Sequence, residues 1–228
     1  MTEYHFKESE ETWNAIAESF DATRGKPWKV VVDFVSTLSV SDVVADIGCG
    51  NGRHLILCVD KCKTVIGLDI SKNLLKITKS KIEGRKVRVV FIHGNLVNIP
   101  IQGNSLDSVL YIAALHNIKG RTNRIQSLNE VKRILKNDGR ALISVWSREQ
   151  ERFRDCFNDI SGNDCEPGDI VIYWRQNKLN APRFYHLYSK EEFIEDIKQS
   201  GLKIEQFSEA RIRSTQYPDN YFAVVRKG

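Results

Sequence analysis

A ten-residue stretch, 43–52, constrains the fold of this chain more than any other. It reads V-V-A-D-I-G-C-G-N-G, an apolar β-rich run that carries Asp46 and leads into glycines at every second position. A second apolar run, 64–68, ends at Asp69, about 20 residues further on, which is where a nucleotide-binding βαβ unit places its acid. A strand, a glycine turn and an acid closing the next strand form a cradle for a nucleoside cofactor. The glycines let the backbone approach the ligand, and we expect Asp69 to accept hydrogen bonds from both ribose hydroxyls.

The glycine spacing favours one cofactor class. Dinucleotide sites use G-x-G-x-x-G, because a pyrophosphate sits against N–H groups at a helix N-terminus. Here the third glycine comes one residue early, and Asp46 precedes the first. The resulting D-x-G-x-G-x-G resembles motif I of class I S-adenosylmethionine methyltransferases, so we expect S-adenosylmethionine. The alternative is a glycine turn without a ligand, which the pair of acids disfavours.

Length and hydrophobic pattern predict one α/β domain. A chain of 228 residues, 41% of them hydrophobic, can bury a sizeable core. Strand and helix patterns alternate along it, which predicts a mostly parallel sheet. We expect a Rossmann-like class I methyltransferase fold with a seven-stranded sheet and a C-terminal antiparallel hairpin, since no helix separates the last two strands. The expected strands are 43–47, 65–69, 87–92, 105–111, 140–146, 202–207 and 221–225, with a small one at 170–174, and the expected helices are 9–23, 30–38, 52–58, 74–82, 124–135 and 189–200.

Within a single domain, 1–228, residues 1–38 are expected to form an N-terminal helical lid and 148–188 an insertion on the substrate side. The chain shows no signal peptide and no apolar run near the ~18 residues of a membrane span, so we expect a cytoplasmic protein without a membrane partner.

The net charge of +5 favours a polyanionic partner. No C-x-x-C occurs and no zinc set is complete, which predicts buried reduced thiols and no metal. The five cysteines are Cys49, Cys58, Cys62, Cys156 and Cys165.

Several segments together resemble one methyltransferase family. They are similar to the tRNA methyltransferases that esterify 5-carboxymethyluridine at the wobble position, and to the methyltransferase half of AlkB-type tRNA hydroxylase fusions. The most specific are T-R-G-K-P-W at 23–28 and R-F-Y-H-L-Y at 183–188. The others are motif I at 45–52, I-A-A-L-H-N at 112–117, A-L-I-S-V-W at 141–146 and D-N-Y-F-A-V-V at 219–225.

The chain departs from this family in three places. Asn95 stands where an aspartate usually meets the adenine amino group, although its carbonyl can still accept that hydrogen bond. A pair of histidines is reduced to His116 followed by Asn117, and the segment between Trp146 and Arg183 is short. A small-molecule carboxylate or oxygen methyltransferase on the same fold is the alternative function.

The resemblance implies three sets of site residues. A carboxylate acceptor is already ionised at pH 7, so it needs positioning by arginine rather than a general base. The implied catalytic residues are Arg24, His116 and Arg183. The implied cofactor residues are Asp46, Gly48, Cys49, Gly50, Asn51, Gly52, Asp69, Ile70, Asn95, Leu96 and Ile112. The implied substrate residues are Lys26, Trp28, Tyr185, His186, Tyr188 and Asn220, with His186 more plausible as a structural histidine.

Two partners follow from the resemblance. The first is the anticodon loop of tRNA, and the second is a small zinc-binding activator protein that pairs with strand 87–92. In the usual strand order that strand is an edge, and it is apolar with only Arg88 to discourage pairing. Basic residues that we expect to gather against tRNA are Lys119, Arg121 and Arg124, then Arg148, Arg152 and Arg154, then Arg211 and Arg213.

Overall fold

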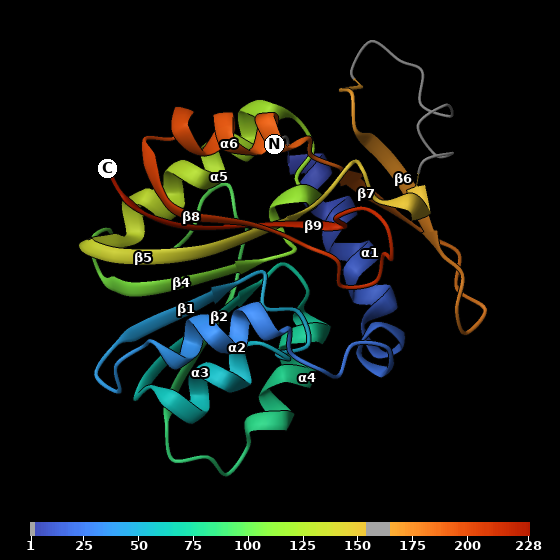
Figure 1. Ribbon diagram of the computed structural model, residues 1–228. Helices are drawn as coiled ribbons and strands as arrows, with labels where there is room; N and C mark the ends of the chain where they lie inside the picture. The colour runs from blue at the N-terminus through green and yellow to red at the C-terminus, as the bar shows by residue number, and fades with distance from the viewer. Residues whose placement is uncertain (1–2, 154–164) are drawn as a thin grey trace.

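A seven-stranded sheet forms the centre of the protein (Figure 1). The computed structural model describes residues 3–153 and 165–228. The strand order is β3-β2-β1-β4-β5-β9-β8, so β3 is an edge as expected. The strands are β1 (Val43–Ile47), β2 (Thr64–Asp69), β3 (Arg88–His93), β4 (Leu106–Ile112), β5 (Leu135–Trp146), β8 (Leu202–Ala210) and β9 (Asn220–Lys227).

Strand directions confirm the expected fold. The strands from β3 to β5 are parallel, and β9 runs antiparallel to both of its neighbours, β5 and β8. The order reverses between β1 and β4, so a crevice is expected where the carboxyl ends of these two strands diverge.

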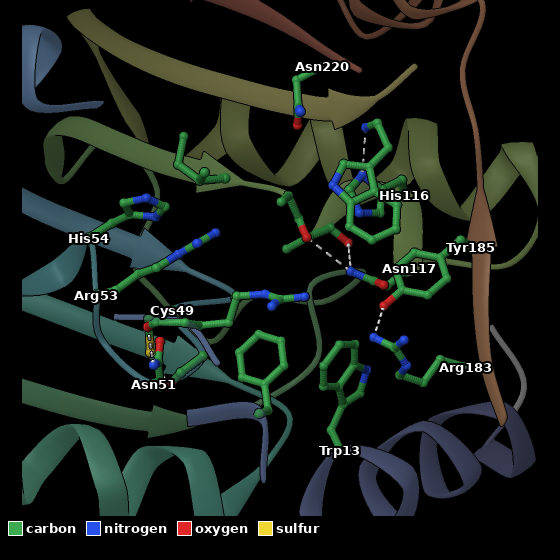
Figure 2. Close-up of a pocket in the computed structure, with 18 of the residues that line it drawn as sticks. Trp13, Cys49, Asn51, Arg53, His54, His116, Asn117, Arg183, Tyr185 and Asn220 are labelled. Carbon is green, nitrogen blue, oxygen red and sulfur yellow. Dashed lines mark hydrogen bonds between the residues drawn. The ribbon is translucent and has the colours of Figure 1, made fainter. Parts of the chain in front are cut away.

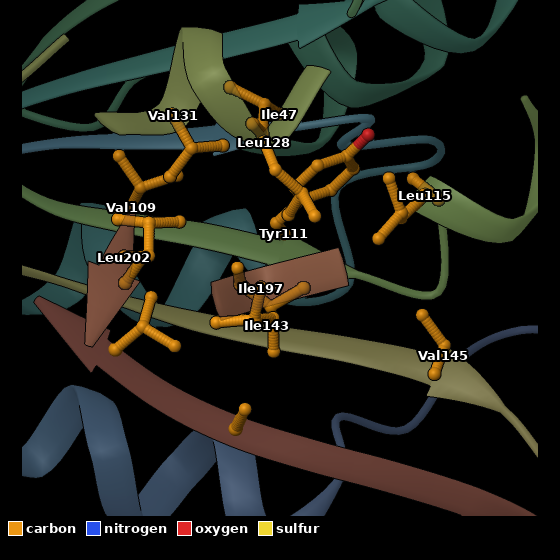
Figure 3. Packing of buried hydrophobic residues seen from close by; sticks show 14 of the residues in the cluster. Ile47, Val109, Tyr111, Leu115, Leu128, Val131, Ile143, Val145, Ile197 and Leu202 are labelled. Atoms are coloured by element: carbon orange, nitrogen blue, oxygen red, sulfur yellow. The ribbon is translucent and has the colours of Figure 1, made fainter. Parts of the chain in front are cut away.

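Helices cover both faces of the sheet (Figure 1). On one face, α5 and α6 contribute residues such as Leu128, Val131 and Ile197 to a buried core (Figure 3). On the other, α2, α3 and α4 contribute Val31 and Leu55 to a second core. The helices are α1 (Glu3–Ala22), α2 (Lys29–Ser36), α3 (Leu55–Lys61), α4 (Lys72–Ile82), α5 (Arg121–Ile134) and α6 (Lys190–Gln199), with a 3-10 turn η1 (Leu115–Asn117).

The junction of α5 and β5 differs from the sequence prediction. The sequence predicted a helix over 124–135 and a strand from 140, with N-D-G at 137–139 between them, yet α5 ends at Ile134 and β5 begins at Leu135. Leu135 is fully buried and pairs with Leu106, which fixes it in an extended conformation. The N-D-G therefore lies where the register between β4 and β5 shifts, before regular pairing resumes at Arg140.

A small two-stranded sheet forms beside the main one. The predicted strand at 170–174 is confirmed as β6 (Asp169–Trp174), and it pairs antiparallel with β7 (Ala181–His186), which the sequence analysis did not predict. Helix α1 packs against α4 and β7 and so lies between the main sheet and this small one.

The thiols follow the prediction with one exception. Three cysteines, Cys49, Cys58 and Cys62, are buried and unpaired, whereas Cys165, shortly before β6, is exposed. Cys156 lies outside the described residues.

Within 3–153 and 165–228, no helix has both the length and the apolar character needed to cross a membrane.

Candidate active site

A cavity of about 430 Å³ opens at the carboxyl ends of β1, β2 and β4 (Figure 2). The motif I loop lines one side, where Figure 2 shows Cys49, Asn51 and Arg53. Across the cavity lie Arg183 and Tyr185 on β7. The cavity thus occupies the crevice expected from the strand order and joins the main sheet to the small one.

The motif I loop requires glycine at two positions. Gly48 and Gly52 both have positive φ, 73° and 77°. A Cβ on Gly48 would collide with the side chain of Ala114, and a Cβ on Gly52 would collide with that of Thr78. The loop is thereby packed directly against the residues after β4 and against α4.

Two buried acids mark the cofactor end of the cavity. The Asp69 carboxylate accepts hydrogen bonds from the backbone N–H groups of Gly50 and Ser71, both at 2.8 Å. Asp46 is 2% exposed, and its Oδ2 has no hydrogen-bond partner among the described residues. Burial raises the pKa of Asp46 to about 7, with Asp69 adding to the shift, and burial raises the pKa of Asp69 to about 6. Such a site favours a cationic, hydrogen-bond-donating ligand.

Arginines crowd the rest of the cavity. Arg24, Arg152, Arg183 and Arg213 all line it, and none forms an ion pair with an acid in the described part of the chain. Burial, followed by the charge of Arg213, lowers the pKa of Arg24. This end of the cavity therefore favours an anion.

Arg183 is held in an aromatic frame. Its guanidinium lies 4.7 Å from the ring centre of Trp174 and 5.2 Å from that of Tyr185. It also donates a hydrogen bond to the Tyr185 hydroxyl. The side chain is 7% exposed, and its Nε has no partner among the described residues. A buried guanidinium with a donor to spare is suited to a carboxylate.

His116 is fully buried in η1 at the cavity wall. Its Nδ1 accepts a hydrogen bond from the Trp146 N–H at 3.0 Å, so the neutral ring carries its proton on Nε2. Burial lowers the pKa of His116 to about 3. Its Nε2 has no partner within the described residues, so His116 is a hydrogen-bond donor rather than a general base.

Asn117 braces the turn after β4. Ala113 has a positive φ of 53°, which is strained for a residue with a Cβ. The Asn117 side-chain amide donates to the carbonyl oxygens of Ala113 and Ala114, both at 3.2 Å. Asn117, which stands where the resembled family has a second histidine, thus stabilises this turn and also lines the cavity.

Arg24 and Trp28 lie against the motif I side. The Asn51 side chain donates to the Arg24 carbonyl oxygen at 2.7 Å, which places the T-R-G-K-P-W segment on the cofactor loop. The Trp28 backbone N–H donates a hydrogen bond to His54 Nε2 at 3.4 Å, and the Arg53 guanidinium lies 4.6 Å from the Trp28 ring centre.

The cavity gathers most of the predicted site residues. All three predicted catalytic residues line it. All of the predicted cofactor residues except Gly52 line it as well. Of the predicted substrate residues, Trp28, Tyr185 and Asn220 do so. Lys26 is exposed outside it. His186 bonds to Asp169 and Glu192, and Tyr188 packs on Phe193 in the main core, so neither reaches the cavity. The sequence analysis missed several lining residues, among them Arg53, His54, Asn117, Trp146, Gln150 and Phe153.

Possible metal ligands occur together at only one place within the described ranges, Glu166, Asp169 and His186. The Arg124 guanidinium donates to Glu166, and the His186 ring donates from Nδ1 to Asp169 and from Nε2 to Glu192. The cluster is thus an internal ion network that joins β6 and β7 to α5 and α6.

A family described as a methyltransferase domain matches residues 45–143, from β1 into β5. A structure of an S-adenosylmethionine-dependent methyltransferase from Methanosarcina mazei superposes with a TM-score of 0.72 at 17% identity, covering 89% of this chain and 98% of that one. Residues 45–143 thus carry a methyltransferase domain, and the fold is that of the S-adenosylmethionine-dependent methyltransferases. S-adenosylmethionine fits the cavity. The Asp46 oxygen that lacks a hydrogen-bond partner suits the cationic part of this ligand, and the Asp69 carboxylate suits the hydroxyl groups of its ribose.

Sequence relatives of this methyltransferase confirm the resemblance seen in its motifs. The Mus musculus protein named tRNA (carboxymethyluridine(34)-5-O)-methyltransferase ALKBH8 is 31% identical over 86% of this chain and 27% of that protein. The Schizosaccharomyces pombe protein named tRNA (carboxymethyluridine(34)-5-O)-methyltransferase is 29% identical over 99% of this chain and 98% of that protein. The chain thus spans about a quarter of the mouse protein and nearly all of the fission-yeast one.

A second solved structure shows a similar methyltransferase in an assembly. It is the complex of a Haloferax volcanii methyltransferase with the Trm112 methyltransferase activator. The TM-score is 0.68 at 16% identity, covering 97% of this chain and 96% of that one.

Cofactor binding by the methyltransferase is expected to release protons between pH 6 and 7. The pKa of Asp46 is about 7 and that of Asp69 about 6, and a cationic ligand lowers both by favouring the ionised form. The measurement is titration calorimetry with S-adenosylmethionine at pH 6.5 in buffers that differ in ionisation enthalpy. Asp46→Asn should remove roughly three quarters of the proton release, because at pH 6.5 Asp46 is mostly protonated and Asp69 mostly ionised. A binding heat independent of the buffer would contradict the assignment.

Proposed function

We propose that this methyltransferase esterifies the carboxylate of 5-carboxymethyluridine at the wobble position of tRNA. The observation that carries the proposal is the buried, acid-free Arg183 facing the cavity across from the cofactor acids. A side chain suited to a carboxylate thus lies in the same cavity as the proposed cofactor site. The S. pombe relative, which matches along nearly its whole length, supports the same substrate.

The residues suit an acceptor that needs no base. Bound S-adenosylmethionine supplies a sulfonium methyl, which a carboxylate oxygen takes by in-line displacement as the S–CH₃ bond breaks, leaving a neutral thioether. Arg183 and Arg24 orient the carboxylate, and His116 Nε2–H donates a hydrogen bond to the acceptor. No proton has to leave, which agrees with the pKa of His116, about 3.

Methyl transfer tests the proposal directly. Purified protein, with radiolabelled S-adenosylmethionine, is incubated with tRNA from a strain lacking the homologous gene, and separately with small carboxylic acids. Methoxycarbonylmethyluridine should appear in the tRNA digest by mass spectrometry. Methylation of the acids alone would favour a small-molecule methyltransferase.

The tRNA surface is smaller than the sequence suggested. Arg124 is fully buried and bonded to Glu166, so the expectation that it faces tRNA is wrong. Arg121 is paired with Asp196 and Arg148 with Glu192. Arg154 lies outside the described residues. The proposed contacts that stay without an acidic partner in the described part are Lys119, Arg152, Arg211 and Arg213.

A partner protein is proposed for the β3 edge. Val90 on this edge is 38% exposed, and the strand leaves one side of the sheet unpaired. The H. volcanii assembly supports an activator protein as the partner. The proposed activator is a small zinc-binding protein that pairs with this edge. Residues 1–38 are proposed as a lid over the cavity, 148–188 as the substrate-side insertion, and the cytoplasm as the compartment where tRNA is met.

Val90→Lys is expected to weaken the complex with such an activator at least tenfold, because it places a charge on the pairing edge. Val89 is unsuitable for this test, since it packs against the core beside α2 and α3. Co-purification and analytical ultracentrifugation with the activator measure the effect. Val32→Lys, at a valine 42% exposed on α2, is the matched control and should bind normally. An isolated chain that is monodisperse and fully active alone would exclude the partner.

A further inference from the structure

Two of the cavity arginines lie at its mouth. Arg152 and Arg213 line the cavity but are exposed, whereas Arg183 is buried and Arg24 half-buried. The charge of Arg152 acts on both Arg24 and Arg183, and that of Arg213 acts on Arg24, in each case lowering the pKa of the inner arginine. The mouth arginines therefore stand close enough to the inner pair for the like charges to repel.

The acids beside these arginines are engaged with backbone groups. The Asp219 carboxylate accepts hydrogen bonds from the N–H groups of Ile212, Arg213 and Ser214, at 2.8, 2.6 and 2.9 Å. This carboxylate closes the loop before β9 and fixes the backbone of Arg213. It leaves the Arg213 guanidinium without an acidic partner among the described residues.

A second acid ties the two arginine-bearing loops together. Glu151 Oε1 accepts from the N–H groups of Gln216 and Tyr217, at 2.7 and 3.3 Å. Residue 151 precedes Arg152, and residues 216 and 217 follow Arg213 in the same loop. Arg152 and Arg213 are thus presented from one joined scaffold, with their charges left for a ligand.

We propose that Arg152 and Arg213 form a second anion subsite that binds a backbone phosphate of the nucleotide whose base enters the cavity. The inference rests on the proposed function. A base that is splayed out of a single strand enters a pocket while its phosphates stay at the entrance. The inner arginines bind the carboxylate, and the mouth arginines bind the phosphodiester. The site thereby distinguishes a nucleotide in a strand from a free nucleoside or a small acid.

The test compares two small acceptors, 5-carboxymethyluridine and its 3′,5′-bisphosphate. The wild-type protein should methylate the bisphosphate with a kcat/KM about 10- to 100-fold higher. Arg213→Gln, alone or combined with Arg152→Gln, should reduce this preference to within about threefold, because kcat/KM for the bisphosphate falls more than kcat/KM for the nucleoside. Arg211→Gln is the control, because Arg211 is exposed in the same loop but does not line the cavity. It should keep the preference.

Outcomes separate this inference from the proposed function. A wild-type protein without preference, or an Arg213→Gln protein impaired equally on both acceptors, overturns the subsite. If neither acceptor nor tRNA is methylated, the proposed function fails, and binding of a short single-stranded oligoribonucleotide then decides the subsite. The slope of log affinity against log salt should fall by about 0.7 in Arg213→Gln. An unchanged slope and affinity in Arg213→Gln overturns the subsite.

Discussion

Asp69→Ala is expected to lower the affinity for S-adenosylmethionine by roughly 30- to 1,000-fold. We propose that the carboxylate accepts two hydrogen bonds from the ribose, and charge-assisted bonds of this kind are together worth about 2–4 kcal/mol. The same carboxylate anchors Gly50 and Ser71, so its loss also loosens the cofactor loop. Titration calorimetry at pH 7.5, above the pKa of about 6, measures the effect on the ionised acid.

Two variants make this measurement interpretable. Asp69→Asn keeps the size and one acceptor oxygen and should give an intermediate loss. Asp60→Ala removes an exposed acid that pairs with Arg85 on the surface and should bind normally. Thermal unfolding of each variant checks that the protein is folded. Unchanged affinity in a folded Asp69→Ala protein would remove Asp69 from the cofactor site.

The cofactor half of the site could be predicted because it is local in sequence. Motif I and Asp69 belong to one strand-turn-helix-strand unit, and parallel pairing of β1 with β2 brings them together in any such fold. The pattern also predicted the sheet, its edge and its terminal hairpin. It could not reveal that the Asp46 and Asp69 side chains would be buried so deeply that their pKa values approach neutrality.

The substrate half is assembled from segments distant in sequence, and hydrophobic pattern says little about such contacts. Arg152, Arg183 and Arg213 come from three loops or strands separated by about 30 residues each, and only the resemblance indicated Arg183. The resemblance gave Tyr185, His186 and Tyr188 as substrate residues, with His186 more plausible as a structural histidine, and of these Tyr185 lines the cavity. In β7, alternation sends Arg183 and Tyr185 to the cavity and His186 to Asp169, and beyond the strand Tyr188 enters the core.

Loss of the inner arginines should have the largest effect on turnover. Arg183→Lys keeps a positive charge but removes the planar fork and the stack between Trp174 and Tyr185. Truncating one partner of a buried charge pair costs about 2–5 kcal/mol, so kcat/KM on tRNA should fall on the order of 10²- to 10³-fold. Affinity for S-adenosylmethionine should stay within about twofold. Arg175→Lys is the matched control, because Arg175 stacks on Tyr173 in the same small sheet but lies outside the cavity.

Arg24→Ala extends the test to the residue nearest the cofactor loop. We expect it to abolish turnover while cofactor affinity stays nearly intact, because its guanidinium is assigned to the substrate carboxylate. Its backbone carbonyl, however, accepts a hydrogen bond from the Asn51 side chain, so Arg24 is also attached to the motif I loop. Steady-state kinetics on tRNA and calorimetry with S-adenosylmethionine therefore have to be measured on the same preparation. A loss confined to turnover supports a carboxylate clamp formed with Arg183. An equal loss of turnover and cofactor affinity would instead make Arg24 a support for the motif I loop and leave Arg183 as the carboxylate-binding residue.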